Sequence, residues 1–151
     1  MKIYKNFNVS KKFKSSAIAI GNFDGFHLGH QKVIKSGKYL ARKHKLKFGL
    51  LVFHPLPVMF FNKKIKNFRI DSLKQKIETS KKLGIDFIII KKFDKKFSKT
   101  SAENFIEHVL HKKLKAKLIF ISQNFKFGKN RAGNINLLKK KKVFTNIKQK
   151  L

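Results

Sequence analysis

The sequence predicts an α/β fold whose parallel strands form an open, doubly wound sheet. Four short runs are almost continuously apolar, which is typical of strands covered on both faces of a sheet. The segments between them have helical spacing, and strand–helix alternation favours parallel strands joined by right-handed crossovers. We expect Met1–Val9 to add an edge strand and Val143–Ile147 to add a final one. The four main predicted strands are Ala17–Ile20, Phe48–Phe53, Phe87–Ile90 and Leu118–Ile121.

Helical spacing marks three segments between the predicted strands. The first predicted helix has Gly37 at its waist, and the second begins after Asp71–Ser72 and ends before Gly84. The third begins at residues 100–103 (TSAE), a sequence typical of a capping box. The three apolar stripes consist of Val33, Ile34, Leu40 and Ala41; of Leu73, Ile77 and Leu83; and of Phe105, Ile106, Val109, Leu110 and Leu114.

The composition indicates one folded domain with a real core. The chain has 151 residues, of which 42% are hydrophobic and 17 are Phe, and this is too apolar for a disordered polycation. The sequence contains no Cys, which excludes disulfides, thiolate metal sites and thiol nucleophiles. No apolar run approaches the roughly 20 residues of a membrane span, and no secretory signal is visible. We therefore expect a cytoplasmic protein without a membrane partner.

The charge is strongly positive, with 38 Lys and Arg against 7 Asp and Glu and a net charge of +31. Such a charge attracts nucleic acid. However, only Arg42, Arg69 and Arg131 are arginines, the residue that recognises phosphates and bases with paired hydrogen bonds. The lysines are spread along the chain, and the densest block, Lys139–Lys142, is typical of a solvated helix end. These features favour a drift toward A/T-rich codons over a nucleic-acid partner.

Three polar or glycine-rich segments directly follow predicted strands. They are residues 21–30 (GNFDGFHLGH), 54–57 (HPLP) and 122–133 (SQNFKFGKNRAG). In open α/β sheets, ligands bind beyond the carboxyl ends of the strands. We therefore expect the three segments to meet at one edge of the sheet and to form the functional site.

The first segment combines tight turns with two histidines at the start of a helix. Gly21 and Gly25 allow the backbone to turn sharply and to approach a ligand closely. His27 and His30 are three residues apart and would project to one side of the helix N-terminus, where unpaired N–H groups favour phosphate. Gly29 would leave room for a nucleotide between the imidazoles. The competing interpretation is a plain strand-to-helix turn with two incidental histidines.

The remaining acidic and histidine side chains carry weaker indications of function. Asp24 would contact a nucleotide or magnesium, or it would only fix the turn. His54 is a loop residue in preference to a catalyst, and His44, His108 and His111 belong to solvated helix surfaces by their pattern. We expect no metal site made by the protein alone, because the sequence has only 7 carboxylate side chains.

The third segment places two aromatic residues beside cations. Phe125 and Phe127 occupy alternate positions and would anchor the loop in the core. Lys129 and Arg131, close to Gly128, would instead let the loop close over phosphates. The position of this loop, opposite the histidine turn in the predicted sheet, favours a role in binding.

The sequence resembles the FAD synthetase domain of bacterial bifunctional riboflavin kinase/FAD synthetases. The resemblance is carried by residues 21–31 (GNFDGFHLGHQ), 53–57 (FHPLP) and 124–133 (NFKFGKNRAG), and it covers nearly the whole chain. The resemblance implies a Rossmann-like nucleotidyltransferase fold of the His-x-Gly-His type. It implies transfer of AMP from ATP to FMN, giving FAD and pyrophosphate, with Mg²⁺.

The resemblance also implies roles for individual residues. His27 and His30 would be catalytic, by donating hydrogen bonds to phosphate oxygens. The residues expected to bind ATP are Gly21, Asn22, Phe23, Asp24, Gly25, Gly29, Asn124 and Arg131. Those expected to bind FMN are Phe53, Pro55, Pro57 and Asn124.

The sequence departs from the family pattern at three places. Leu56 stands where the family has a second His, and Ser122 stands where a Gly is common. The family's downstream Ile-Ser-Ser-Thr-x-Ile-Arg segment and its riboflavin kinase domain do not occur within the 151 residues. We expect residues 1–151 to form a single FMN adenylyltransferase domain, with Lys126, Lys129 and Arg131 as the cations available in place of that segment. The resemblance also admits a separate riboflavin kinase as a partner.

Four functions follow from these observations. The leading one is FMN adenylyltransferase. The others are a nucleotide-binding remnant without activity, a basic RNA-binding module, and another adenylyl- or cytidylyltransferase of the same superfamily. RNA binding would depend steeply on salt and would not depend on His30.

Overall fold

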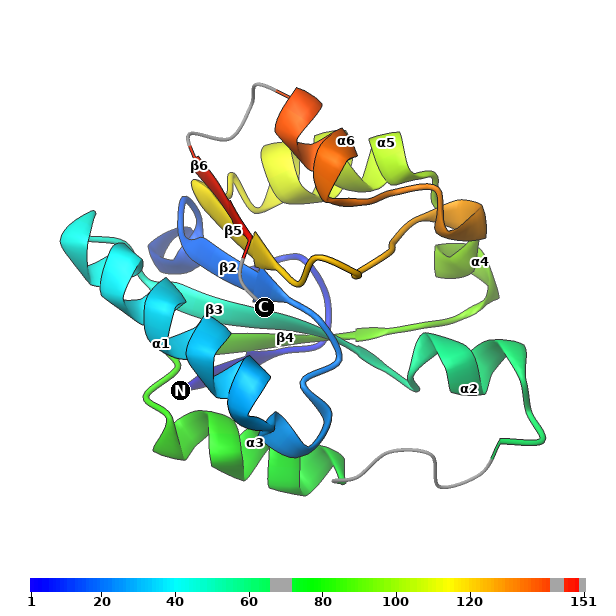
Figure 1. Cartoon of the computed structure of the whole chain (residues 1–151), viewed down its shortest axis with the longest axis horizontal. Coiled ribbons are helices and arrows are strands. Elements are labelled where there is room, and N and C mark those ends of the chain that lie inside the picture. The colour runs from blue at the N-terminus through cyan, green and yellow to red at the C-terminus, as the bar shows by residue number, and fades with distance from the viewer. Residues whose placement is uncertain (66–71, 142–145, 150–151) are drawn as a thin grey trace.

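The computed structural model describes residues 1–65, 72–141 and 146–149 (Figure 1). Within these ranges the strands form one six-stranded sheet in the order β1-β4-β3-β2-β5-β6, and each neighbouring pair is parallel. This arrangement confirms the predicted α/β fold. The strands are β1 (Lys2–Tyr4), β2 (Ala17–Ile20), β3 (Phe48–His54), β4 (Phe87–Lys92), β5 (Leu118–Ile121) and β6 (Asn146–Gln149).

The four central strands begin where the apolar runs predict, whereas the edge strands differ. The N-terminal strand covers only Lys2–Tyr4 of the expected Met1–Val9, because Phe7 and Val9 leave the sheet edge and pack in the core. The final strand is Asn146–Gln149. The predicted range of Val143–Ile147 overlaps it, and residues 143–145 lie outside the described residues.

Alternate residues of the four central strands enter two separate apolar clusters, one on each face of the sheet. In β2, Ile18 and Ile20 join one cluster, and Ala17 and Ala19 join the other. The first cluster is covered by α5 (Ala102–Asn104), its continuation η3 (Phe105–Lys113) and α6 (Ile135–Lys140). The second is covered by α1 (Leu28–Lys43) and α3 (Leu73–Lys82) (Figure 1). The sheet is therefore doubly wound, as predicted.

Two glycine–phenylalanine pairs bring the helices and strands into close contact. A side chain at Gly37 of α1 would overlap the ring of Phe48 in β3. A side chain at Gly49 of β3 would overlap the ring of Phe87 in β4. The large rings of Phe48 and Phe87 are fully buried because the glycines leave them this space.

The second helix has the ends that the sequence predicts. Ser72 caps α3 and forms a capping box with Gln75, and Gly84, with a φ of 71°, follows the C-cap residue Leu83. Asp71 lies outside the described residues.

The third predicted helix begins one residue later than expected. Ser101, and not Thr100, is its N-cap, and the Ser101 hydroxyl accepts a hydrogen bond from the backbone N–H of Asn104 at 3.1 Å. The capping box expected between Thr100 and Glu103 is therefore wrong. Thr100 is held instead by the preceding turn and by the later loop, since its N–H donates to Phe97 and its carbonyl accepts from Lys129.

The shorter elements lie mostly in the connections. They are η1 (Lys11–Phe13), η2 (Asp24–Phe26), α2 (Pro57–Phe61), α4 (Lys95–Ser98) and η4 (Lys129–Arg131). No helix in the described part of the chain is long and apolar enough to cross a membrane.

The direction of winding reverses between β2 and β5. From β2 the chain passes through α1 to β3 on one side, and it later returns through η3 to β5 on the other side of β2. Such a reversal leaves a crevice beyond the carboxyl ends of the two strands, where ligands bind in folds of this kind. Residues 21–30 and 122–133 leave β2 and β5 at this crevice.

Candidate functional site

The turn between β2 and α1 is anchored by two buried aromatic rings. Phe23 and Phe26 both have left-handed backbone conformations, with φ of 48° and 43°. Their rings stack with centroids 6.0 Å apart, and both are buried. Because the rings fix a strained backbone, Asn22 and Gly25 are held at the surface. Phe23 would therefore meet ATP with its backbone, and its assignment as an ATP-binding residue stays a prediction.

His27 is the N-cap of α1. Its Nδ1 accepts a hydrogen bond from the backbone N–H of His30, at 3.4 Å. A neutral imidazole that accepts at Nδ1 carries its proton on Nε2. Since the side chain is exposed, this Nε2–H is available to donate to a bound anion.

The two histidine rings stack directly on each other. Their centroids are 3.6 Å apart and their planes are inclined by 23°. A Cβ atom at Gly29 would lie 3.0 Å from Cε1 of His27, so the space beside Gly29 holds the His27 ring. The structure thus differs from the expectation that Gly29 leaves a gap between the imidazoles.

His30 is half-buried beneath His27 and beside the ring of Phe23, whose centroid is 5.2 Å away. Its pKa is lowered from 6.5 to about 4, chiefly by burial and then by His27 and Lys76, while Asp24 acts in the opposite direction. The Nδ1 atom is buried and has no hydrogen-bond partner among the described residues. At neutral pH, His30 is therefore an uncharged imidazole that can give one N–H to a ligand.

Lys76 is a site residue that the sequence analysis missed. It lies on α3 with 5% of its surface exposed, and its Nζ donates a hydrogen bond to the carbonyl of Asn22 at 2.6 Å. One signal was present in the sequence. Lys76 is three residues after Leu73 and seven before Leu83, so it falls on the apolar face of the predicted helix.

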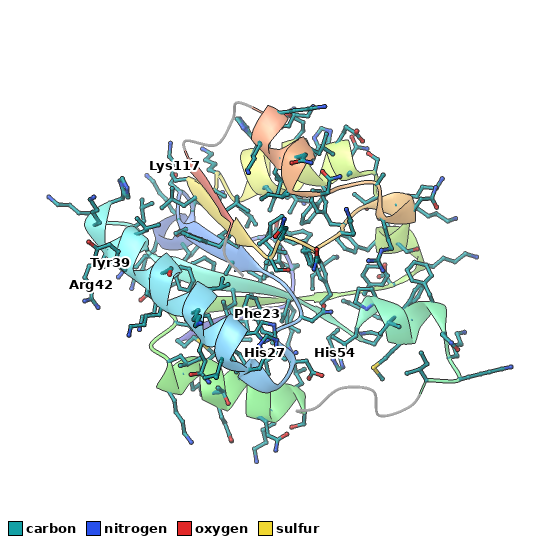
Figure 2. All side chains as sticks on the ribbon, viewed as in Figure 1. Phe23, His27, Tyr39, Arg42, His54 and Lys117 are labelled. Atoms are coloured by element: carbon teal, nitrogen blue, oxygen red, sulfur yellow. The ribbon has the colours of Figure 1, made fainter. Side chains whose placement is uncertain are left out.

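The second segment, residues 53–57, places the polar side chain of His54 at the site and buries two apolar side chains nearby. His54 ends β3 and lies at the same end of the sheet as His27 (Figure 2). Phe53 is only 6% exposed and packs against the rings of Phe97 and Phe105. Leu56 is buried just before α2, and an apolar side chain fits this buried position.

The roles predicted for this segment concern contacts with FMN. Pro55 and Pro57 are partly exposed and remain accessible to a ligand. Phe53 is accessible only at its margin. The assignment of these three residues to FMN stays a prediction.

The third segment is tied to the core by its aromatic residues. Phe127 and Gly133 exchange two backbone hydrogen bonds, of 3.1 and 2.7 Å, that close the loop. Phe125 stacks on Phe127, and both pack against the core, as the simpler interpretation of these aromatics predicted. Asn124 and Arg131 are exposed on the loop, where their predicted role in binding remains to be tested.

Gly128 fits this loop against α5. Its φ is 78°, and a Cβ atom at this position would lie 2.6 Å from the Cα of Ala102. The backbone N–H of the next residue, Lys129, donates to Thr100 at 2.8 Å. The loop is therefore docked by its backbone, and its polar side chains are left at the surface.

The parallel sheet, the reversal of winding between β2 and β5 and the histidine pair at a helix N-terminus define the class of Rossmann-like α/β folds. A solved structure described as a macrolide-efflux protein from Streptococcus pneumoniae shares this fold. Its TM-score is 0.79, with 22% sequence identity, and the match covers 98% of this chain and 50% of that one. Within this class, the chain belongs to the FAD synthetase family, whose model matches residues 9–150.

Several curated relatives are described as bifunctional riboflavin kinase/FMN adenylyltransferases. The protein of Buchnera aphidicola subsp. Schizaphis graminum is 41% identical over 92% of this chain and 45% of its own length. The Haemophilus influenzae protein is 37% identical over 87% of this chain and 42% of its own length. The Escherichia coli K12 protein is 32% identical over 82% of this chain and 39% of its own length. The chain thus spans less than half the length of these relatives.

Proposed function

We propose that this chain is an FMN adenylyltransferase, which transfers AMP from ATP to FMN and forms FAD and pyrophosphate. The observation that carries the proposal is the stacked pair of His27 and His30 at the N-terminus of α1, at the end of the sheet where the winding reverses between β2 and β5. Membership of the FAD synthetase family and the description of the relatives support the same activity. The proposal treats residues 1–151 as one adenylyltransferase domain acting in the cytoplasm.

The reaction needs alignment and charge compensation more than it needs a base. An oxygen of the FMN phosphate attacks the α-phosphorus of ATP, and the bond from that phosphorus to the bridging oxygen of the β-phosphate breaks. Pyrophosphate leaves with the electron pair of that bond. A phosphate monoester has a second pKa of about 6, so the attacking group is already a dianion at neutral pH. The protein must hold the reactants in line and stabilise the charge on the phosphates.

The histidine pair suits this task. The Nε2–H of His27 and one N–H of neutral His30 would donate to the phosphate oxygens of ATP, next to the unpaired N–H groups of α1. Asn22 and Gly25, held at the surface by the buried rings, would line the adenosine and phosphate path. Asn124 would lie between ATP and FMN, and Arg131 would face the departing pyrophosphate.

We assign Mg²⁺ to the complex with ATP. Among the described residues, no three His, Asp or Glu side chains gather into a metal site. Mg²⁺ in such reactions is commonly held by substrate phosphates and water with one or two carboxylates, and Asp24 is the carboxylate of this turn. When bound, the cation would neutralise phosphate charge.

The test is the formation of FAD from FMN, ATP and Mg²⁺ by the purified chain, followed by chromatography. We expect His30→Ala to lower kcat about 100-fold, because it removes a donor aimed at developing charge. His44→Ala is the matched control, since His44 is exposed at the other end of α1, and it should retain full activity.

Two results would contradict the proposal. If the folded wild-type chain bound ATP but made no FAD, the chain would be the nucleotide-binding remnant instead. If His30→Ala were as active as the wild type, the histidine pair would not be the catalytic group. FMN is added directly, so the assay does not need riboflavin kinase activity.

A further inference from the structure

Lys76 is exceptional among the many basic residues of this chain because it is buried. Of the charged side chains in residues 1–65 and 72–141, it alone is buried, at 5% exposure. Burying an ammonium group is costly unless the group is well paired. The contacts of this buried lysine with the histidine turn should therefore show why the ammonium group is there.

The hydrogen bond of Lys76 joins two elements that are distant in sequence. Its Nζ reaches from α3 to the carbonyl of Asn22 at 2.6 Å, across 54 residues of chain. Asn22 lies between Gly21 and Phe23, at the point where the chain leaves β2 and enters its left-handed turn. The Lys76 contact therefore fixes the backbone just before the segment that presents His27 and His30.

Lys76 also places a positive charge next to the histidine pair. It is one of three charged or titratable groups that act on His30, the others being His27 on α1 and Asp24 in η2. The ammonium repels a proton on His30, and Asp24 attracts one. Because Lys76 is buried below the turn, it acts on the site through the turn and the histidines, without reaching the solvent side where a nucleotide would bind.

We propose that Lys76 is a positioning residue, which holds the carbonyl of Asn22 so that the turn presents both histidines to the phosphates of ATP. This inference rests on the proposed function, since it takes the turn as the site of ATP. If Lys76 served only to stabilise the fold, its replacement would lower the melting temperature and leave the folded site unchanged.

The test compares Lys76→Met, which keeps an unbranched side chain as far as Cε and removes the ammonium group, with Lys74→Met. Lys74 is exposed on the same helix, so the control removes the same charge without touching the turn. We expect Lys76→Met to lower kcat/KM for ATP about 100-fold, mostly through kcat, because a small displacement of aligned groups has an effect of this size. Lys76→Arg, which keeps a charged donor, should recover part of the activity.

A second measurement does not require activity. NMR titration of the histidines should show a higher pKa for His30 in Lys76→Met than in the wild type, with no change in Lys74→Met. The His30 signal is identified by its loss in His30→Ala. If Lys76→Met does not fold, the same titration is made on Lys76→Gln, which keeps a donor and loses the charge.

The outcomes separate this inference from the proposed function. A wild type that makes no FAD would overturn the proposed function, and the titration together with ATP binding would still test Lys76. Unchanged kcat/KM, ATP affinity and His30 titration in folded Lys76→Met would overturn the role of Lys76. Equal effects of Lys76→Met and Lys74→Met would overturn it as well, because a general loss of charge would then be the cause.

Discussion

The turn after β2 and the loop after β5 meet the same crevice but are built differently. Both use buried phenylalanines as anchors, Phe23 and Phe26 in the turn and Phe127 in the loop. In the turn, the polar groups are packed as well, since the two histidine rings stack and Lys76 supports the backbone from below. In the loop, the backbone is docked while Arg131 projects to solvent. The comparison teaches that the turn is organised before any ligand arrives, whereas the side chains of the loop remain free to adjust to one.

The largest expected effect is a loss of stability on replacing Gly128, because the loop can pack against α5 only if this position has no side chain. Gly128→Ala puts a methyl group against the backbone of Ala102 at a φ of 78°. We expect a loss of about 2–6 kcal/mol in the free energy of unfolding, since strained backbone and overpacking each cost about 1–3 kcal/mol. Urea denaturation measures this loss.

The control for Gly128 is Lys129→Ala, at the adjacent exposed position. Its effect should stay within about 0.5 kcal/mol, as is usual for surface substitutions. Equal stability of the two variants would show that the loop is not docked through Gly128.

A smaller effect, on activity and not on stability, is expected at Gly29 in the turn. Gly29→Ala would place a Cβ atom 3.0 Å from Cε1 of His27, and the exposed ring must shift by a few tenths of an ångström to accept it. We expect kcat for FAD formation to fall about threefold to tenfold, because this displacement is smaller than the misplacement of about 1 Å that costs about 100-fold. Alanine is a good helix former, so the melting temperature should not fall.

The control for Gly29 is Lys35→Ala, farther along the exposed side of α1, which should leave kcat unchanged. A stable Gly29→Ala variant with normal kcat would mean that the stacked arrangement of the histidines does not matter for the reaction. If Gly29→Ala lost stability instead, Gly29 would be needed for folding as Gly128 is, and the turn and the loop would not differ in this respect.

The smallest effect concerns the dependence of stability on pH. The pKa of His30 is about 4 in the folded chain and near 6.5 when the ring is exposed, so between these values the unfolded chain binds the additional proton. Stability should therefore fall as the pH decreases from 6.5 to about 4. The decrease should be less steep in His30→Gln, and urea midpoints at a series of pH values measure the difference. Parallel curves for the two proteins would show that His30 is not buried as an uncharged ring.

Much of the fold can be read from the sequence because strands covered on both faces need continuous apolar runs. Phe48–Phe53 and Phe87–Ile90 are such runs, and both are central strands. The edge strand is harder, because Phe7 and Val9 are apolar for a different reason, namely that they cover the core after the strand has ended. The N-cap of α5 is Ser101 because Thr100 is engaged elsewhere: its N–H donates to the carbonyl of Phe97, and its carbonyl accepts from the N–H of Lys129. Local sequence does not reveal these hydrogen bonds.

The site shows the same division between local and distant information. His27 and His30 are evident because glycines and a helix start surround them in sequence. Lys76 is harder to find, because its place on the apolar face of the predicted helix is the one local signal that separates it from the rest of the 38 Lys and Arg residues, and its contact with the turn appears only when α3 is placed beside it. The stacking of the imidazoles also escapes sequence analysis, since Gly29 admits either a ligand or the His27 ring.

The two glycine–phenylalanine pairs have a consequence for the evolution of this protein. Gly37 faces Phe48 and Gly49 faces Phe87 so closely that neither glycine can gain a side chain while its partner ring stays in place. A larger residue at position 37 becomes tolerable only with a smaller one at position 48, and the same applies to positions 49 and 87. Each pair therefore changes by two coupled substitutions, and the intermediate with only one of them passes through a less stable or less well-packed protein.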